Sequence, residues 1–428
     1  MAGIGFELRK LFNEQGLISN VKAYGYSSMT TIGPMLLSIF LIFALQKMMT
    51  YYDGSFIEWE LYIATVTYCF IFSIILTSGL AMVLSRFIAD MLYIKRYEHL
   101  LSSYYGALII IIPISGVIAI VFLSGVTGSL GYKIATYLFF LELTVIWIQS
   151  IYLSVLKDYV RIVRSFIIGV GVSLLSGWLL FLLANLQPTT SAILAIVIGF
   201  FTIVTMTSYH FEITLPKANS KYYFTFIQNL KKYPSLFFTG LFVYSGVYIH
   251  SMVYWYGPFG VKVGDHFRVM PFYDLPVFFA YLSVIPSLVI FVVVVETKFY
   301  EKFRLYYLNV LEGGTFQRIK QAKKEMQKSL LLGASFLIEV QLLFSVLSIA
   351  LGIKVLPTFG FTMVQLDLFI ILCLGFFLFI IMFILVHLLL YFDDRKGALL
   401  ISSFYIIING ISTYWMMILE FNGFGMFI

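Results

Sequence analysis

The sequence has 428 residues, of which 61% are hydrophobic and 11% charged, and its mean hydropathy is +0.96. A water-soluble chain of this length needs more polar residues to cover its surface, so the composition excludes a soluble globular protein. The net charge of +7 would suggest nucleic acid binding in a soluble protein. Here we attribute it to basic loops on the cytoplasmic side of a membrane, and we expect no nucleic acid partner.

Apolar runs long enough to cross a bilayer recur along the whole chain. The runs are continuous rather than alternating, which predicts helices and not strands, so we expect an all-α polytopic membrane protein. Eleven spans are predicted, near residues 27–48, 61–83, 104–123, 134–156, 165–185, 191–212, 234–256, 275–296, 330–352, 366–390 and 398–419.

Residues 1–26 precede the first span and do not form a signal peptide, because Glu7, Arg9 and Lys10 would interrupt its apolar core. Apolar residues at helical spacing predict a short amphipathic helix here, on the cytoplasmic side. That helix would either lie in the membrane interface or pack under the helical bundle, and the sequence leaves both open.

The first span contains the pair Gly33–Pro34 in its first third. Proline removes a backbone hydrogen bond and interrupts a helix, and such points often mark hinges in transporters. Pro113 and Pro286 interrupt later spans in the same way, although a purely structural role is the commoner one for prolines in membrane helices. We expect Gly33 and Pro34 to form the mobile point.

Basic residues predict the orientation. With a cytoplasmic N-terminus, 23 of the 28 Lys and Arg residues fall in cytoplasmic segments. This bias predicts a multi-pass protein of the cytoplasmic (inner) membrane with its N-terminus in the cytoplasm. An odd number of spans leaves the C-terminus outside. The chain stops where another apolar segment could begin, so we expect a last helix to be missing from this sequence, and an eleven-span protein is the alternative.

Two cytoplasmic segments are long and basic. Residues 213–233 form a linker with four lysines, which divides a first six-helix bundle (27–212) from a second helical bundle (234–428). Residues 297–329 end in a basic helical stretch that opens the ninth span. Such segments usually hold the orientation and bind anionic membrane lipid, and docking of a cytoplasmic partner is the alternative.

Three polar side chains fall in the middle of predicted spans. Glu142 and Gln149 are nearly two helical turns apart and share one face of the fourth span, while Glu339 lies in the ninth. A charged carboxylate at the bilayer centre costs at least ~2.5 kcal/mol, so these residues should face the bundle interior or water. Three roles remain open for the glutamates: a protonated group bonding a neighbouring helix, a proton or cation coupling site, and a contact for sugar.

The seventh span, LFVYSGVYIHSMVYWYGP, is rich in aromatic residues. Aromatic faces stack on sugar rings, and tyrosine hydroxyls bond sugar hydroxyls. Tyr244 and Tyr248 lie four residues apart on one face and deep in the span, so they are candidates for lining a translocation path. Trp255 and Tyr256 fit better in the aromatic belt at the membrane interface.

The sequence has no pattern typical of an enzyme, a metal site or a cofactor site. It contains no GxxxxGK[ST] phosphate loop, and Cys69 and Cys373 lie within apolar runs as packing residues. Asp393 and Asp394 invite comparison with the metal–diphosphate sites of membrane transferases. Beside Arg395 they are more simply a solvated loop. We expect no catalysis, no metal and no cofactor.

Three stretches are more specific: GIGFELRKLF (3–12), TTIGPMLLSI (30–39) and ILTSGLAMVLSRFIADMLYIKRYEHL (75–100). Together they resemble the PelG family, the Pel exopolysaccharide transporters of the multidrug/oligosaccharidyl-lipid/polysaccharide (MOP, MATE-like) flippase superfamily. The resemblance implies twelve helices in two pseudo-symmetric six-helix bundles around a central cavity, with alternating access. The eleven visible spans depart from that number.

The resemblance also implies a function, namely transport of a partly cationic amino-sugar polymer across the cytoplasmic membrane for the biofilm matrix, by alternating access or a channel-like path. The implied partners are the cytoplasmic glycosyltransferase and membrane scaffold subunits of the Pel system. Acidic groups such as Glu142 and Glu339 would suit a cationic polymer. The rival hypotheses are an ion-coupled MATE-like exporter, a lipid-linked oligosaccharide flippase and a non-transporting scaffold of a polysaccharide synthase. The sugar, the energy source and the oligomeric state stay open.

Overall fold

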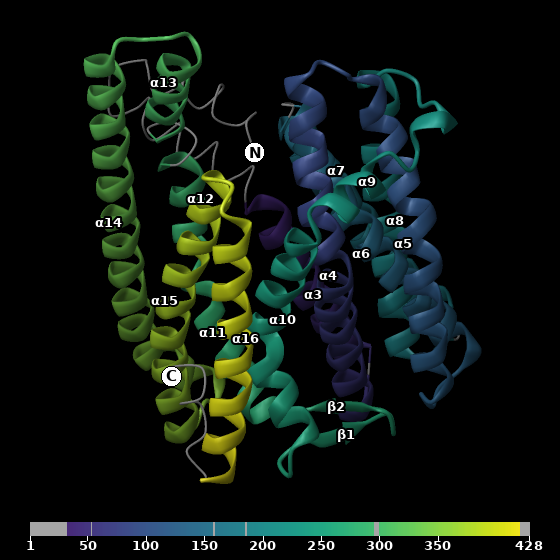
Figure 1. Cartoon of the computed structure of the whole chain (residues 1–428). Coiled ribbons are helices and arrows are strands. Elements are labelled where there is room, and N and C mark those ends of the chain that lie inside the picture. Colours follow the sequence, from purple (N-terminus) through teal and green to yellow (C-terminus); the bar gives the residue numbers. More distant parts are fainter. Residues whose placement is uncertain (1–31, 53, 157–158, 185, 295–298, 420–428) are drawn as a thin grey trace. The chain divides into compact units, whose positions relative to one another are not determined.

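The structure, a computed structural model, describes residues 32–52, 54–156, 159–184, 186–294 and 299–419, without the side chains of residues 154–160. The predicted amphipathic segment 1–26 lies outside these residues. The described elements are α3 (Gly33–Tyr51), α4 (Phe56–Tyr93), α5 (Glu98–Ser124), α6 (Leu130–Leu156), α7 (Tyr159–Leu183), α8 (Pro188–Thr214), η1 (Ser220–Tyr222), α9 (Phe226–Lys232), α10 (Pro234–Tyr256), β1 (Val261–Val263), β2 (Phe267–Val269), α11 (Pro271–Leu282), α12 (Ile285–Val293), α13 (Tyr300–Leu311), α14 (Phe316–Val355), η3 (Leu356–Phe359), α15 (Met363–Tyr391) and α16 (Arg395–Ile418) (Figure 1).

Eleven segments of the described chain are helical, long and apolar enough to cross a membrane, which confirms the predicted all-α polytopic fold. The end of α4 differs from the prediction. α4 has 38 residues and continues to Tyr93, where the sequence predicted an end near residue 83. At ~1.5 Å per residue, α4 is nearly twice as long as a ~30 Å hydrocarbon core requires. α14 begins at Phe316, with the basic helical stretch that the sequence predicted to open the ninth span.

A capping box fixes the start of α4. The Ser55 hydroxyl accepts a hydrogen bond from the Glu58 N–H at 3.3 Å, and the Glu58 carboxylate accepts one from the Ser55 N–H at 2.9 Å. Two donors at the helix start that have no partner within the helix are thereby satisfied. The helix can therefore begin abruptly after the preceding turn.

The described chain forms two compact units. The larger unit comprises Gly33–Met270 and Phe392–Gly410, and the smaller unit comprises Ile32 and the described residues of Pro271–Tyr391 and of the segment after Gly410. α10 and most of α16 therefore belong to the same unit as α3–α8, with α10 packed against α4. The predicted division into bundles at residues 213–233 stays a prediction.

In the larger unit, α7 and α8 approach closely through a pair of glycines. A Cβ atom on Gly169 would lie 2.8 Å from the carbonyl oxygen of Gly199, and a Cβ atom on Gly199 would lie 2.7 Å from that of Gly169. Such small-residue contacts are typical of membrane helices, whose association depends on close packing rather than on the hydrophobic effect. Tyr104, Tyr152 and Phe211 fill the interior between α5, α6 and α8.

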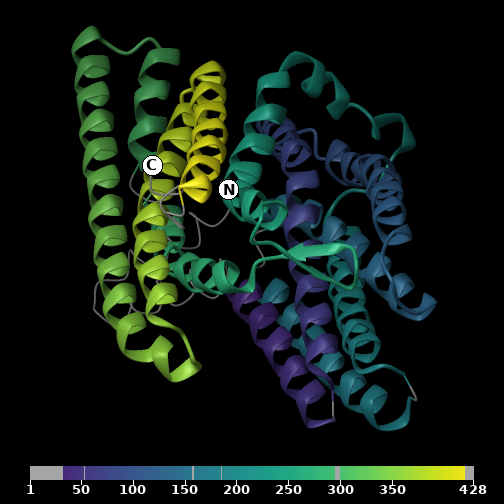
Figure 2. The same ribbon diagram turned by 90° about the horizontal axis from the view of Figure 1, so that it is seen from below.

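After α10 the chain forms an antiparallel hairpin, β1–β2 (Figures 1 and 2). Gly264 and Asp265 in its turn have φ values of 55° and 60°, a backbone region that Gly and Asp adopt more readily than other residues. Tyr68 of α4 holds the hairpin, because its hydroxyl donates to the Arg268 carbonyl at 2.7 Å and accepts from the Arg268 N–H at 3.0 Å. The sequence VKVGDHFRV carried this hairpin signal, which the search for long apolar runs missed.

In the smaller unit, the eighth predicted span consists of two helices, α11 and α12. The break lies at Ser283, shortly before Pro286 in the first turn of α12. Gln341 of α14 lies beside the break, with its amide nitrogen 3.4 Å from the Ser283 carbonyl oxygen and 3.0 Å from the Ser345 hydroxyl. A buried side-chain amide thus bonds a backbone group at the interruption, as the interior of a membrane protein requires.

Candidate functional site

Glu142 lies in the middle of α6 and is half-buried. Its Oε2 atom is buried and has no hydrogen-bond partner among the residues that the structure describes. Leaving a buried acceptor unpaired costs ~1–3 kcal/mol, more when it is charged. The carboxyl group can therefore take a proton, a cation, or a hydroxyl or amino group of a ligand.

Gln149 shares this helix but sits in a closed polar network. Its amide nitrogen lies 3.1 Å from the Tyr104 hydroxyl, 2.9 Å from the Ser208 hydroxyl and 3.1 Å from the Val204 carbonyl oxygen. Because these partners belong to α5 and α8, the network joins three helices, and it lies in the interior of the unit, since Gln149 is only 1% exposed. This arrangement favours a structural role, and the place of Gln149 on a transport path stays a prediction.

Tyr244 and Tyr248 are half-buried on α10. Gly246, between them, lies on the opposite side of the helix and packs against α16. There a Cβ atom would lie 2.6 Å from the Tyr405 ring, and Asn409 donates to the Gly246 carbonyl at 2.8 Å. The two tyrosines therefore face away from α16, and their role in lining a path stays a prediction.

Trp255 does not belong to an interface belt. It is 1% exposed and stacks on Tyr68 with 5.1 Å between ring centroids. Tyr256 is exposed, with the Arg268 guanidinium 5.4 Å from its ring centroid. The expectation for Trp255 was wrong because neighbouring aromatic residues in a sequence do not reveal which ring turns inward.

Glu339 lies on α14 in the smaller unit, and its side chain is exposed. Leu332, Phe336 and Leu343 share its face and are exposed as well. We expected Glu339 to face the bundle interior or water, and within its own unit it is not turned to the interior. Helical spacing shows which residues share a face but not which way that face points. The role of Glu339 on a path stays a prediction.

Gly33 and Pro34 form the first turn of α3 in the described chain. A proline in the first turn breaks no helical hydrogen bond. The Pro34 carbonyl accepts a hydrogen bond from the Ser38 hydroxyl at 2.9 Å. The residues before Ile32 lie outside the described part, and the hinge stays a prediction.

A charged cluster connects the end of α4 with the loop before α16. Arg86 lies 3.2 Å from Asp90 and 3.4 Å from Asp393. Asp393 also pairs with Arg395 at 3.3 Å, and the Arg395 guanidinium lies 4.3 Å from the ring centroid of Tyr233. The sequence interpretation missed this cluster because Arg86 and Asp393 are 307 residues apart and no local pattern links them.

Asp394 has a separate task from Asp393. Its Oδ1 atom accepts a hydrogen bond from the Gly397 N–H at 2.9 Å, at the start of α16. Within the residue ranges given above, no three His, Cys, Asp or Glu side chains are grouped so as to hold a metal ion. Each of the two aspartates thus has its own structural partner.

The comparison with protein families decides the assignment. A family model described as "PelG: Putative exopolysaccharide Exporter (EPS-E)" matches residues 1–428. The chain belongs to the PelG family. The resemblance seen in three N-terminal stretches therefore extends over the whole chain. A comparison with curated proteins finds no match.

The fold of this PelG-family protein is similar to that of MATE transporters of the MOP superfamily. A crystal structure of MATE in complex with MaL6 matches with a TM-score of 0.61 and 12% identity, over 95% of this chain and 90% of that one. An outward-facing multidrug resistance MATE family transporter matches with a TM-score of 0.60 and 12% identity, over 95% and 90%. A MOP superfamily transporter from Pyrococcus furiosus matches with a TM-score of 0.58 and 12% identity, over 94% and 89%. Family and fold together make this protein a multi-pass membrane transporter.

Proposed function

We propose that this PelG-family protein carries a Pel-like amino-sugar polymer across the cytoplasmic membrane for the biofilm matrix. The observation that carries the proposal is the match of an exopolysaccharide exporter family over residues 1–428. The similarity to MATE transporters supports a path between membrane helices, used by alternating access or as a channel.

We assign a contact with the polymer inside the membrane to Glu142. A sugar with a free amine is cationic, and its ammonium would supply the donor that the buried Oε2 atom lacks. Tyr244 and Tyr248 would offer ring faces and hydroxyls to sugar units, and Glu339 a second carboxylate. Gln149 would contribute only if its amide left the network that it now joins.

The orientation and partners belong to the same proposal. The bias of Lys and Arg supports a cytoplasmic N-terminus, which would place residues 213–233 and 297–329 at the inner face. These basic segments would dock the cytoplasmic glycosyltransferase and the membrane scaffold subunits. Polymer would then pass directly from its synthase to the transporter.

The test separates transport from assembly. Cells that lack this protein are complemented with the wild-type chain or an empty vector. The amount of polymer is measured outside and inside the cells, and the rate of polymer synthesis is measured in isolated membranes. The proposal expects synthesis to continue without the protein while extracellular polymer disappears. Loss of synthesis would favour the scaffold hypothesis, and persistent extracellular polymer would refute a role in transport.

A further inference from the structure

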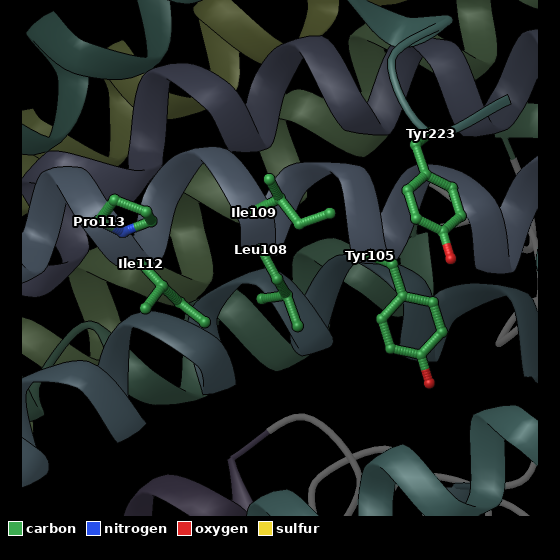
Figure 3. Close-up of a pocket in the computed structure, with 6 residues that line it drawn as sticks. All are labelled: Tyr105, Leu108, Ile109, Ile112, Pro113 and Tyr223. Atoms are coloured by element: carbon green, nitrogen blue, oxygen red, sulfur yellow. The ribbon is translucent and has the colours of Figure 1, made fainter. Parts of the chain in front are cut away.

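A groove of about 440 Å³ runs along the outside of α5 in the larger unit (Figure 3). Four apolar residues of α5 form its length and two tyrosines form one end, and Figure 3 shows the two tyrosine hydroxyls pointing the same way. Ile109 in the groove is 51% exposed, so the groove opens outward. The lining residues are Tyr105, Leu108, Ile109, Ile112, Pro113 and Tyr223.

The tyrosine end carries a negative charge. The Tyr105 hydroxyl donates a hydrogen bond to the carboxylate of Glu212 at the end of α8. The rings of Tyr105 and Tyr223 are 6.3 Å apart between centroids, and Glu212 is exposed beside them. Two aromatic faces and a carboxylate are the combination that binds an ammonium group, through cation–π attraction and a charge-assisted hydrogen bond.

The linker residues that form this end are packed firmly onto α5. A Cβ atom on Gly106 would lie 1.8 Å from the Tyr223 carbonyl oxygen, so the linker backbone passes directly over the helix. The Asn219 N–H donates to the Ser102 hydroxyl at 3.0 Å, about one helical turn nearer the start of α5. The His99 ring packs against the Tyr222 ring with 4.1 Å between centroids. The tyrosine end is therefore a built part of the fold.

The length of the groove fits one hydrocarbon chain of one leaflet. From Tyr105 to Pro113 the helix rises ~12 Å, compared with ~15 Å for half of the hydrocarbon core of a bilayer. Leu108 and Ile112 offer no polar group to a ligand over that distance. A ligand that fits both parts has an apolar chain and a cationic head.

We propose that this groove binds an aminophospholipid, with one acyl chain along α5 and the ammonium group against Glu212, Tyr105 and Tyr223. The headgroup phosphate would lie towards Lys221, which is exposed two residues before Tyr223. A lipid that is only anionic would meet the Glu212 carboxylate without a compensating amine. The inference goes beyond polymer transport, because it assigns a lipid ligand to a site outside the proposed path.

Native mass spectrometry of the purified full chain tests the proposal, with phosphatidylethanolamine and phosphatidylglycerol of identical acyl chains as the two probes. We expect the wild-type protein to bind phosphatidylethanolamine about tenfold more tightly at its first site. Glu212→Gln keeps the size and the hydrogen bond but removes the charge, so the preference should disappear. Leu108→Trp fills the apolar part of the groove and should weaken the binding of both lipids at that site.

Ile118→Trp is the matched control, because Ile118 is an exposed residue of α5 outside the groove, and it should leave both affinities unchanged. If Leu108→Trp does not fold, Ile109→Trp replaces it, since the exposed Ile109 can be enlarged without disturbing the interior. Equal binding of the two lipids by the wild type, a preference for phosphatidylglycerol, or a preference that survives Glu212→Gln would overturn the headgroup assignment. Unchanged binding in both groove-filling variants would overturn the assignment of the acyl chain.

Discussion

Gly106→Ala should release the linker 213–233 from α5. The new Cβ atom would lie 1.8 Å from the carbonyl oxygen of Tyr223 and 2.5 Å from its carbonyl carbon, distances at which the linker backbone must move. Overpacking of this kind costs ~1–3 kcal/mol. If this free energy destabilises the state in which the linker is packed on α5, the fraction of molecules with the linker released from α5 rises roughly 5- to 150-fold.

Limited proteolysis measures this release. Trypsin cleaves after lysine, and Lys217 and Lys221 are exposed in the linker. When closing is faster than cleavage, the cleavage rate follows the population of the open form, so we expect the same 5- to 150-fold increase, roughly, in the variant.

Gly171→Ala is the matched control, since a Cβ atom there would meet nothing within 4 Å. It should leave linker cleavage unchanged and can stabilise α7 by up to ~1 kcal/mol through helix propensity. Cleavage of Gly106→Ala at the wild-type rate, or equal acceleration in both variants, would refute the reasoning.

Three further substitutions test contacts within the larger unit. Asp393→Asn keeps a residue type that tolerates the left-handed backbone at this position but removes the ion pairs with Arg86 and Arg395. The free energy of unfolding should therefore fall by ~0.5–2 kcal/mol in low salt and by less in high salt. An equal salt-dependent loss in the control Asp394→Asn, whose side chain can still cap α16, would contradict this reasoning. Gln149→Leu should reduce the free energy of unfolding by ~1–2 kcal/mol and so lower the thermal unfolding midpoint. Unchanged stability together with reduced export, at matched protein levels, would show instead that Gln149 contacts the polymer. Tyr68→Phe removes both hydrogen bonds to the hairpin, and faster amide hydrogen exchange in residues 261–269 should result, whereas unchanged exchange would mean that ring packing alone holds the hairpin.

The sequence was sufficient to predict the helices because each one satisfies its backbone internally and must present about twenty apolar residues to the bilayer. That requirement acts on every span separately and leaves a local signal. It does not extend to the part of α4 beyond its apolar run, because helix outside the hydrocarbon core needs no apolar surface. The hairpin β1–β2 had a local signal in its Gly–Asp turn, but its strands have only three residues each.

The candidate site was harder to predict because it depends on contacts between distant segments. The polar character of Glu142 and Gln149 was visible in the sequence, yet one has an unpaired buried oxygen and the other a closed network. Glu339 shows the same limit, since its exposure depends on which neighbours cover α14. Gln341, which bonds the break at Ser283, was overlooked because a neutral amide in an apolar run resembles a packing residue.

The most direct test of the account is export of polysaccharide by cells that carry Glu142→Gln, with membrane levels of the protein matched to wild type. Gln keeps the size and the hydrogen-bonding capacity but cannot carry the negative charge that an ammonium group would meet. We predict that export falls roughly tenfold or more, because a hydrogen bond to a charged group is lost. Glu98→Gln, at an exposed carboxylate of the same unit, should export like the wild type. Unchanged export by Glu142→Gln would contradict the account, since the charge of Glu142 would then play no part in meeting the polymer.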